Sequence, residues 1–320
     1  MLDISIVTPV FNEQENLKIL YERLVKVLNQ QKLSYEIIFV DDGSKDDTLS
    51  ILKQLHKKDP CVKVISFSRN FGHQIAVSAG LDYSTGKCVI TMDSDLQDAP
   101  EDIPKFLAQW QKGYDCVYAV RVRRQESWVR SFFFKSFYRI FNQLSEVTLP
   151  LDAGDFCLMD RKVVNALKAM PERNRFLRAL RCWAGFNHIG IPQERPMRQG
   201  GSIKNGMKRL FHIASNGIFA FSYLPLRLAS ITGALISFGG FLLILKILYE
   251  KFFTSKPILG WTSLMITVIF FSGLIILFLG LIGEYICRIY DETKGRPLYF
   301  MKESRGLPDS DKNFPHENNT

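Results

Sequence analysis

Short apolar runs alternate with amphipathic segments along the N-terminal part of the chain. Four runs are rich in apolar and β-branched side chains, as buried strands are: residues 4–8, 35–40, 62–67 and 88–92. Three segments repeat their apolar positions with helical spacing: residues 13–29, a segment that begins after Ser44, and residues 73–82. Strands that alternate with helices predict βαβ units in a parallel sheet, where ligands bind beyond the carboxyl ends of the strands.

The alternation weakens after residue 115. Residues 127–144 have the spacing of a basic, aromatic-rich amphipathic helix, residues 152–160 predict a further strand, and residues 175–183 predict a further helix. In the N-terminal part of the chain, polar clusters follow the predicted strands. They are residues 9–13, 41–46, 69–73 and 93–98.

Two long apolar runs indicate a membrane protein. Residues 228–245 and 257–283 carry no charged side chain, and a membrane-spanning helix needs about 20 residues. Two buried core helices are the alternative. We expect transmembrane helices at about 228–249 and 260–286, joined as a hairpin by a short linker.

The positive-inside rule sets the orientation of this hairpin. Basic residues flank it on both sides: Lys204, Lys208, Arg209, Arg227, Arg288, Lys294 and Arg296. The intervening loop has only Lys251 and Lys256. We therefore expect a multi-pass protein of the inner (plasma) membrane with both termini in the cytoplasm. Several glycines in the spans could pack within the hairpin or between the subunits of a homo-oligomer.

The overall charge supports a membrane or phosphate partner. The chain has 41 Lys and Arg against 32 Asp and Glu, a formal net charge of +9, and many of the basic residues flank the apolar runs. No zinc-finger spacing or RNA-binding signature is present, so no nucleic-acid partner is expected. The six cysteines are scattered without metal-ligand spacing and predict reduced, buried thiols. The first residues show no signal-peptide pattern.

The sharpest local motif is Asp93-Ser94-Asp95-Leu96-Gln97-Asp98, directly after an apolar run. Two carboxylates two residues apart at a strand end can hold Mg²⁺ or Mn²⁺ beside a diphosphate. An acidic turn that caps the next helix is the alternative. A second acidic cluster begins at Asp41-Asp42-Gly43-Ser44, where Asp41 or Asp42 could accept hydrogen bonds from a base or ribose and Ser44 or Asp46 could cap a helix. The spacing of a phosphate-binding P-loop is missing.

These motifs together resemble family 2 glycosyltransferases with the GT-A fold. The resemblance rests on the order and spacing of residues 9–13, 41–44, 70–73 and 93–98. More narrowly, the chain is similar to the polyprenyl-phosphate glycosyltransferases, which include bactoprenol glucosyltransferase and dolichyl-phosphate mannose synthase. Residues 280–297 resemble the tail of the bactoprenol enzymes.

The resemblance implies an α/β fold with four parts. Residues 1–200 would form a GT-A catalytic domain, Rossmann-like with a mostly parallel sheet, and residues 201–227 would form amphipathic helices at the membrane interface. Residues 228–288 would hold the two transmembrane helices, and residues 289–320 a cytoplasmic tail.

The resemblance also implies roles for individual residues. The donor nucleotide-sugar would contact Pro9, Phe11, Glu13, Asp41, Asp93 and Lys204. Asp95, with Gln97, would bind the Mg²⁺ or Mn²⁺ ion. Asp93, Asp95 and Asp155 would be catalytic. The acceptor phosphate would be bound by Arg121, Arg130, Lys135 and Arg198. His73 could touch the donor or start a helix.

The expected reaction is transfer of a hexose to polyprenyl phosphate with inversion. The tail favours UDP-glucose as donor and undecaprenyl phosphate as acceptor, with mannose, aminoarabinose, GlcNAc or galactose as alternatives. One loop departs from the family pattern: Arg198, Gly201 and Lys204 keep register, but Ser202, Ile203 and Asn205 replace Glu, Ser and Tyr. That departure is the only support for a non-catalytic, nucleotide-sugar-binding scaffold. A processive polysaccharide synthase is disfavoured because only two spans are predicted and Arg178 to Trp183 miss the required spacing.

Overall fold

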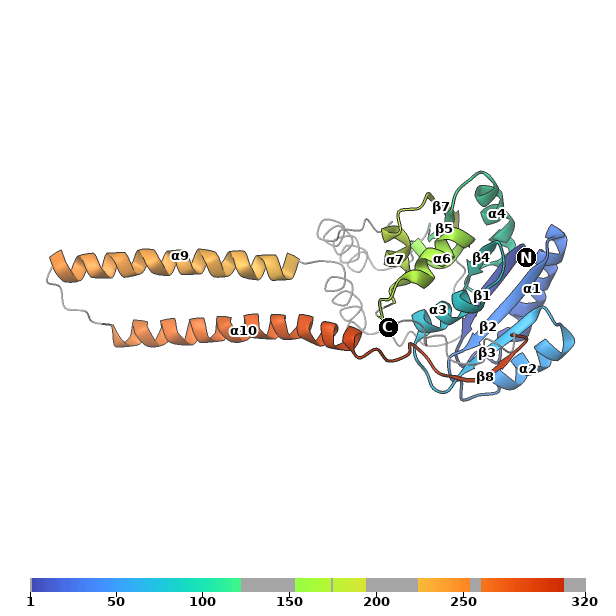
Figure 1. Cartoon of the computed structure of the whole chain (residues 1–320), viewed down its shortest axis with the longest axis horizontal. Coiled ribbons are helices and arrows are strands. Elements are labelled where there is room, and N and C mark those ends of the chain that lie inside the picture. The colour runs from blue at the N-terminus through green and yellow to red at the C-terminus, as the bar shows by residue number, and fades with distance from the viewer. Residues whose placement is uncertain (1, 122–152, 174, 194–223, 254–259, 308–320) are drawn as a thin grey trace. The chain divides into compact units, whose positions relative to one another are not determined.

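The computed structural model describes residues 2–121, 153–173, 175–193, 224–253 and 260–307. The chain forms two compact units (Figure 1). The first comprises Met1–Asn142, Val147–Lys208 and Arg296–Thr320, and holds the sheet. The second comprises Gln143–Glu146 and Arg209–Gly295, and holds two long helices.

Four parallel strands form the centre of the sheet. They are β1 (Ile4–Val10), β2 (Tyr35–Asp41), β3 (Val62–Phe67) and β4 (Cys88–Thr91), in the order β3-β2-β1-β4. Nearly every residue of these strands is buried, because helices cover both faces of the sheet. The strands predicted from the sequence are confirmed within one or two residues at each end.

Four further strands complete an eight-stranded sheet of order β7-β5-β6-β4-β1-β2-β3-β8. These strands are β5 (Cys116–Arg121), β6 (Ala153–Asp160), β7 (His188–Gln193) and β8 (Met301–Arg305). β6 runs antiparallel to β4 and β5, and β8 runs antiparallel to β3. The mostly parallel α/β sheet is therefore confirmed. The sequence did not predict β5, β7 or β8, and β8 lies in the segment expected to be a tail.

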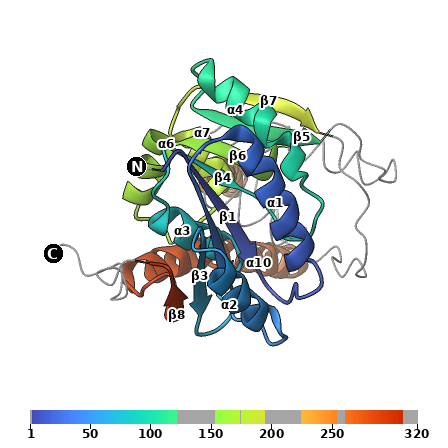
Figure 2. The ribbon, with the colours of Figure 1, turned by 90° about the vertical axis from the view of Figure 1, so that its right-hand side faces the viewer.

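Helices cover both faces of this sheet (Figure 2). One face packs against α1 (Leu17–Gln31), α2 (Thr48–Lys58) and α4 (Ile103–Gln111), which follows a 3-10 turn, η1 (Pro100–Asp102). The other face packs against α3 (His73–Tyr83) and α6 (Arg161–Ala169), and α6 also contacts α7 (Leu177–Trp183). α3 approaches β1 so closely that a Cβ on Gly80 would lie 2.2 Å from Val7 Cγ1. A glycine is required there.

The second unit contains α9 (Leu224–Phe253) and α10 (Trp261–Thr293), which contact each other. Residues 228–245 and 261–283 of the two apolar runs are thus helical, as predicted. Among the described residues, one segment, Phe270–Thr293, is long and apolar enough to cross a membrane, and its apolar window has no buried residue. The predicted interfacial helices at 201–227 lie almost wholly outside the described residues.

Candidate active site

The candidate site lies at the carboxyl ends of the parallel strands. Strand order reverses at β1, since β2 and β3 lie on one side of it and β4 on the other. Open α/β sheets bind ligands in the crevice that forms at such a reversal. The loops that follow these four strands contain the polar clusters predicted from the sequence.

The loop after β2 is built around two buried carboxylates. Asp41 Oδ1 accepts a hydrogen bond from the Ser44 N–H at 3.0 Å, and its Oδ2 accepts one from the Ser66 hydroxyl at 2.8 Å. Asp42 accepts hydrogen bonds from the N–H groups of Phe71 and Gly72, at 2.7 and 3.0 Å. Burial raises the pKa of Asp42, and these two N–H groups oppose that shift.

Gly43 allows the loops after β2 and β3 to touch. Its φ is +70°, and a Cβ on it would lie 2.5 Å from the carbonyl carbon of Arg69. Any side chain would force the two loops apart. The acidic turn and the loop at residues 68–72 therefore form one structure.

The loop after β1 joins the same structure. Asn12 has a φ of +55°, its N–H donates to the Ser44 hydroxyl, and its side-chain oxygen accepts from the Lys45 N–H. The Glu13 N–H donates to the Thr48 hydroxyl at 3.0 Å. Pro9 is buried within β1, whereas the ring of Phe11 is 42% exposed. Of these predicted donor residues, Phe11 offers an accessible aromatic face.

The loop after β4 presents Asp93 and Asp95 in a strained turn. The Gln97 N–H donates to Asp95 Oδ1 at 3.1 Å, and the Asp93 N–H donates to Asp98 Oδ2 at 3.2 Å. Leu96 between them has a φ of +61°, a costly conformation for a branched side chain. Asp98 braces this turn rather than capping the next helix, which was the alternative left open by the sequence.

His73, the first residue of α3, connects the loop after β3 to this turn. Its Nε2 lies 2.9 Å from Asp93 Oδ1. Burial disfavours the imidazolium, but the hydrogen bond and charge of Asp93, together with the charge of Asp155, outweigh that cost and raise the pKa of His73. The helix-start role considered from the sequence is confirmed, and contact with the donor stays a prediction.

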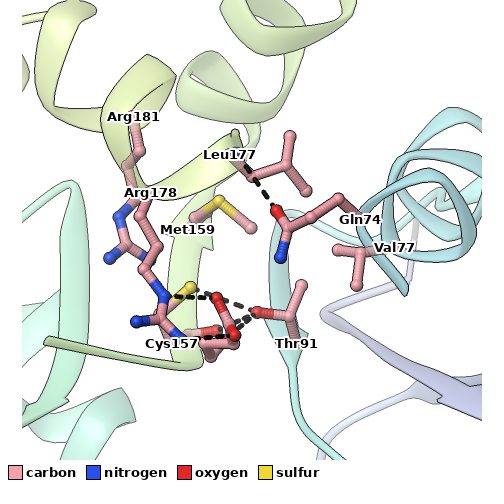
Figure 3. A pocket seen from close by; sticks show the side chains of 9 residues that line it. Gln74, Val77, Thr91, Cys157, Met159, Leu177, Arg178 and Arg181 are labelled. Atoms are coloured by element: carbon pink, nitrogen blue, oxygen red, sulfur yellow. Dashed lines mark hydrogen bonds and ion pairs between the residues drawn. The ribbon is translucent and has the colours of Figure 1, made fainter. Parts of the chain in front are cut away.

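Asp155 reaches the same edge because β6 runs antiparallel to β4. Residues near the start of β6 therefore lie beside the end of β4, and the Thr91 hydroxyl donates to the Asp155 carbonyl oxygen at 2.7 Å. Arg178 on α7 binds the Asp155 carboxylate through two hydrogen bonds, of 2.6 and 2.5 Å (Figure 3). Burial opposes the charged form, but Arg178 and His73 hold the pKa of Asp155 well below its usual range.

A small pocket opens beside this ion pair. Gln74, Thr91, Asp155, Arg178 and Arg181 line it, with apolar side chains between them (Figure 3). The Gln74 side-chain oxygen accepts a hydrogen bond from the Leu177 N–H at 3.1 Å, which fixes α7 against α3.

Residues 5–168 match the family model described as glycosyl transferase family 2, which is just over half of the 320 residues. The chain belongs to glycosyl transferase family 2. The matched region of this glycosyltransferase contains β1 to β4 with their acidic loops, and also Asp155. It ends before α7, so Arg178 lies outside it.

Relatives extend over nearly the whole glycosyltransferase. "Uncharacterized glycosyltransferase YkcC" of Bacillus subtilis (strain 168) is 45% identical over 95% of this chain and 94% of its own. The bactoprenol glucosyl transferase of Shigella phage SfX is 37% identical over 95% of this chain and 100% of its own. Because these alignments run almost from end to end, the similarity includes the apolar helices.

Similarity to solved structures is more distant. Glucosyl-3-phosphoglycerate synthase from Mycobacterium tuberculosis, in complex with Mn²⁺, UDP-glucose and phosphoglyceric acid, matches with a TM-score of 0.48 and 16% identity. The match covers 68% of this chain and 78% of that one. At this distance it carries no functional argument.

The acidic turn fits a divalent cation that also binds phosphate. Among the described residues, no group of three or more His, Cys, Asp or Glu could hold a metal ion alone. Mg²⁺ is commonly held by one or two carboxylates, with waters and substrate phosphates completing its shell. Asp95 supplies one carboxylate and Gln97 a side-chain oxygen, so the metal would require the donor diphosphate and waters as further ligands.

The predicted acceptor residues are only partly described. Arg121 is the last residue of β5, and its side chain is not described. Arg130, Lys135, Arg198 and Lys204 lie outside the described residues, as does the altered loop at 202–205. From the sequence, Arg178 was considered only as part of a synthase motif, and its position beside Asp155 was not predicted. Arg178 and Arg181 lie one helical turn apart on a short helix, and this spacing is the signal that could have indicated that Arg178 belongs to the site.

Proposed function

We propose that this glycosyltransferase moves a hexose, most readily glucose from UDP-glucose, onto undecaprenyl phosphate or a similar polyprenyl phosphate. The observation that carries this proposal is the 37% identity, over nearly its full length, to proteins named bactoprenol glucosyl transferase. A relative so similar in both the sheet and the helices supports the same class of lipid acceptor. Another sugar on the same lipid is the nearest alternative.

The donor site we propose lies at the carboxyl ends of β1, β2 and β4 and includes Pro9, Phe11, Glu13, Asp41 and Asp93. Lys204, which lies outside the described residues, belongs to the same proposal. The exposed ring of Phe11 can stack on a base, while the hydrogen bonds that Asp41 accepts fix the turn after β2. Hydrogen bonds between the loops after β1, β2 and β3, and between His73 and Asp93, order this edge of the sheet before a donor arrives.

Asp95, assisted by Gln97, would hold Mg²⁺ or Mn²⁺. The ion, when bound, neutralises the charge that develops on the departing diphosphate. The protein's contribution is the strained turn at Leu96, in which the Gln97 N–H donates a hydrogen bond to Asp95 Oδ1. Asp93 would contact the donor, and His73 would keep its carboxylate oriented.

The acceptor phosphate is already an anionic nucleophile, so no strong protein base is needed. A phosphate oxygen forms a bond to the anomeric carbon from the face opposite the diphosphate, and the bond from that carbon to the diphosphate breaks. UDP departs, and the configuration inverts. Arg121, Arg130, Lys135 and Arg198 would position the acceptor phosphate.

Asp155 would act in this step as a fixed charge. A carboxylate whose pKa is held low by Arg178 is a weak base, which favours a positioning and electrostatic role over proton removal. Together with His73 and Arg178 it would fix the electric field around the anomeric carbon.

Membrane attachment through α9 and α10 belongs to the same proposal. We assign the transmembrane hairpin to 228–288, with the catalytic domain at 1–200, interfacial helices at 201–227, and both termini in the cytoplasm. Its support is the exposed apolar surface of both helices, for example Leu235 and Ile276, and the basic residues that flank them. The aqueous side would then supply UDP-glucose, and the bilayer the lipid.

The test is transfer of label from radioactive UDP-glucose to undecaprenyl phosphate by the purified full-length protein with Mg²⁺ or Mn²⁺. We expect label in the organic phase, lost with chelator and with Asp95→Asn. Asp3→Asn is the matched control, because Asp3 precedes β1 at the opposite end of the sheet and should leave transfer unchanged.

Two outcomes would redirect the proposal. Transfer only with another nucleotide sugar would replace glucose and keep the reaction class. No transfer from any donor, with intact UDP binding, would refute the enzyme assignment and support the non-catalytic scaffold suggested by Ser202, Ile203 and Asn205.

A further inference from the structure

The chain that leaves α10 returns to the sheet unit as an edge strand. β8 pairs antiparallel with β3, with Val64 opposite Arg305 and Ser66 opposite Glu303. Two aromatic residues, Tyr299 and Phe300, precede this strand. We call residues 299–305 the C-terminal strap.

Tyr299 anchors the strap in the core. It is only 2% exposed, and its ring stacks on Phe67, the last residue of β3, with centroids 4.9 Å apart. Its hydroxyl donates to an Asp82 carboxylate oxygen on α3 at 3.2 Å. Tyr299 therefore lies between the end of β3 and the helix that begins at His73.

The strap also contacts the loop that joins β3 to α3. The Ser68 N–H donates to the Phe300 carbonyl oxygen at 2.9 Å. The rings of Phe71 and Phe300 have centroids 6.4 Å apart, and the Phe71 ring meets Phe67 edge-on at 5.6 Å. The loop thus rests on an aromatic cluster supplied partly by the C-terminus.

The other side of this loop faces the candidate active site. Phe71 and Gly72 donate their N–H groups to Asp42, and His73 binds Asp93. The contacts form a continuous path from Tyr299 and Phe300, through residues 68–73, to the two acidic loops of the donor site.

Protection of the sheet edge is a simpler role for β8, since an unpaired edge strand invites aggregation. That role needs only the strand pairing and surface contacts such as the ion pair between Lys53 and Glu303. It does not require the two aromatic residues ahead of β8, nor their packing under the site loop.

We propose that Tyr299 and Phe300 are positioning residues: they hold residues 68–73, and through them Asp42 and Asp93, in the arrangement that binds the nucleotide-sugar donor. This inference rests on the proposed function for the identity of the ligand. It assigns the segment after α10 an indirect part in donor binding.

The test uses the full-length protein in detergent and two measurements. The first is the affinity for UDP in the presence of Mg²⁺, with the KM for UDP-glucose and kcat measured alongside. The second is hydrogen exchange of the Phe71 and Gly72 amides. Tyr299→Ala and Phe300→Ala remove the aromatic contacts. Phe300 is 41% exposed, so we expect its replacement to leave the fold intact.

Tyr299→Phe and Glu303→Gln are the controls. Tyr299→Phe keeps the stacking on Phe67 and loses the hydrogen bonds of the hydroxyl, including the one to Asp82. Glu303→Gln weakens the strand's surface contact and leaves the aromatic cluster intact. We expect UDP binding to weaken about tenfold in Tyr299→Ala and about threefold in Phe300→Ala, with KM rising more than kcat falls. Both controls should stay within about twofold of wild type.

Faster hydrogen exchange at the Phe71 and Gly72 amides should accompany the loss of UDP affinity in the two alanine variants. Unchanged UDP affinity and exchange in both would overturn the proposal, as would an equal loss in Glu303→Gln, which would indicate edge protection alone. If wild type transfers no sugar, the proposed function fails, and the exchange measurement still decides whether the strap holds the loop.

Discussion

The acidic residues at the two ends of the central sheet differ in how far they are buried and in which elements supply their partners. At the amino ends of the parallel strands, Glu36 is 1% exposed and accepts hydrogen bonds from the Ser5 hydroxyl and from the Thr85 N–H and hydroxyl. Lys63 forms an ion pair with it. At the carboxyl ends, Asp93 and Asp155 are 25% and 21% exposed, and their partners come from the first residue of α3 and from α7.

The difference separates a structural charge from a functional one. Glu36 is enclosed by β1, β3 and the turn before β4, so its partners are provided by elements that cannot move apart without unfolding. Asp155 and Asp93 are paired as firmly, yet each retains a surface that a ligand can reach. A buried ion pair by itself therefore does not identify the site; its location on the sheet does.

The largest effect should come from the carboxyl end. We expect Asp155→Asn to reduce sugar transfer by about a hundredfold to a thousandfold, because it removes the charge that fixes Arg178 beside the reacting centre. Its melting temperature should fall by less than that of a substitution at Glu36. Turnover within a few-fold of wild type would show that Asp155 has no part in the reaction.

The next largest effect should be on stability alone. Glu36→Gln leaves Lys63, whose side chain is 16% exposed, without its charge partner, and breaking a largely buried pair of this kind costs about 3 kcal/mol. A loss of that size lowers the melting temperature by roughly 10 °C. The KM for UDP-glucose, measured well below the transition, should not change, and a rise in KM would show that the two ends are coupled.

The stabilisation by Glu36 should depend on pH. Burial raises its pKa, but Lys63, Ser5 and Thr85 outweigh burial, and the folded-state pKa is lowered from the usual 4.5. The folded protein thus holds fewer protons, so the contribution is fully present above pH 4.5 and is lost as pH falls through the folded-state pKa. The melting-temperature gap between wild type and Glu36→Gln should be constant near neutral pH and shrink in acid. A gap that persists unchanged would assign it to packing.

The smallest effect should come from a surface pair of similar geometry. Arg23 and Glu101 form two hydrogen bonds, but their side chains are 33% and 54% exposed. Because solvent screens such a pair, Arg23→Gln should cost at most about 0.5 kcal/mol. Differential scanning fluorimetry would then show a shift of at most about 2 °C. A loss as large as that of Glu36→Gln would show that burial is not what separates the two pairs.

Much of the fold could be predicted because its signals are local. The strands at the centre are short β-branched runs between helical segments, and β3 was placed at the observed residues, Val62–Phe67. The long helices were predicted from the length of the two apolar runs, which carry no charged side chain. β7 and β8 are the two edge strands of the sheet, and β5 lies between β7 and β6. These three strands could not be predicted, because their partners lie far away in sequence.

The site divides in the same way. Asp93, Asp95 and Asp155 stand out by residue type and motif, whereas the pairing of Asp155 with Arg178 and of His73 with Asp93 depends on how α7 and α3 pack. Residue type indicates which chemistry is available. It does not indicate which groups already have partners.

Patterns within about ten residues thus specified the βαβ order, the acidic turns and the apolar helices, since strand, turn and helix preferences act over that range. Folding alone brought β6 antiparallel against β4, set Arg178 on Asp155, and returned Tyr299 from beyond the last helix to stack on Phe67. Those contacts join segments separated by tens to hundreds of residues. They are chosen by burial and charge pairing across the whole sheet, which no local pattern encodes.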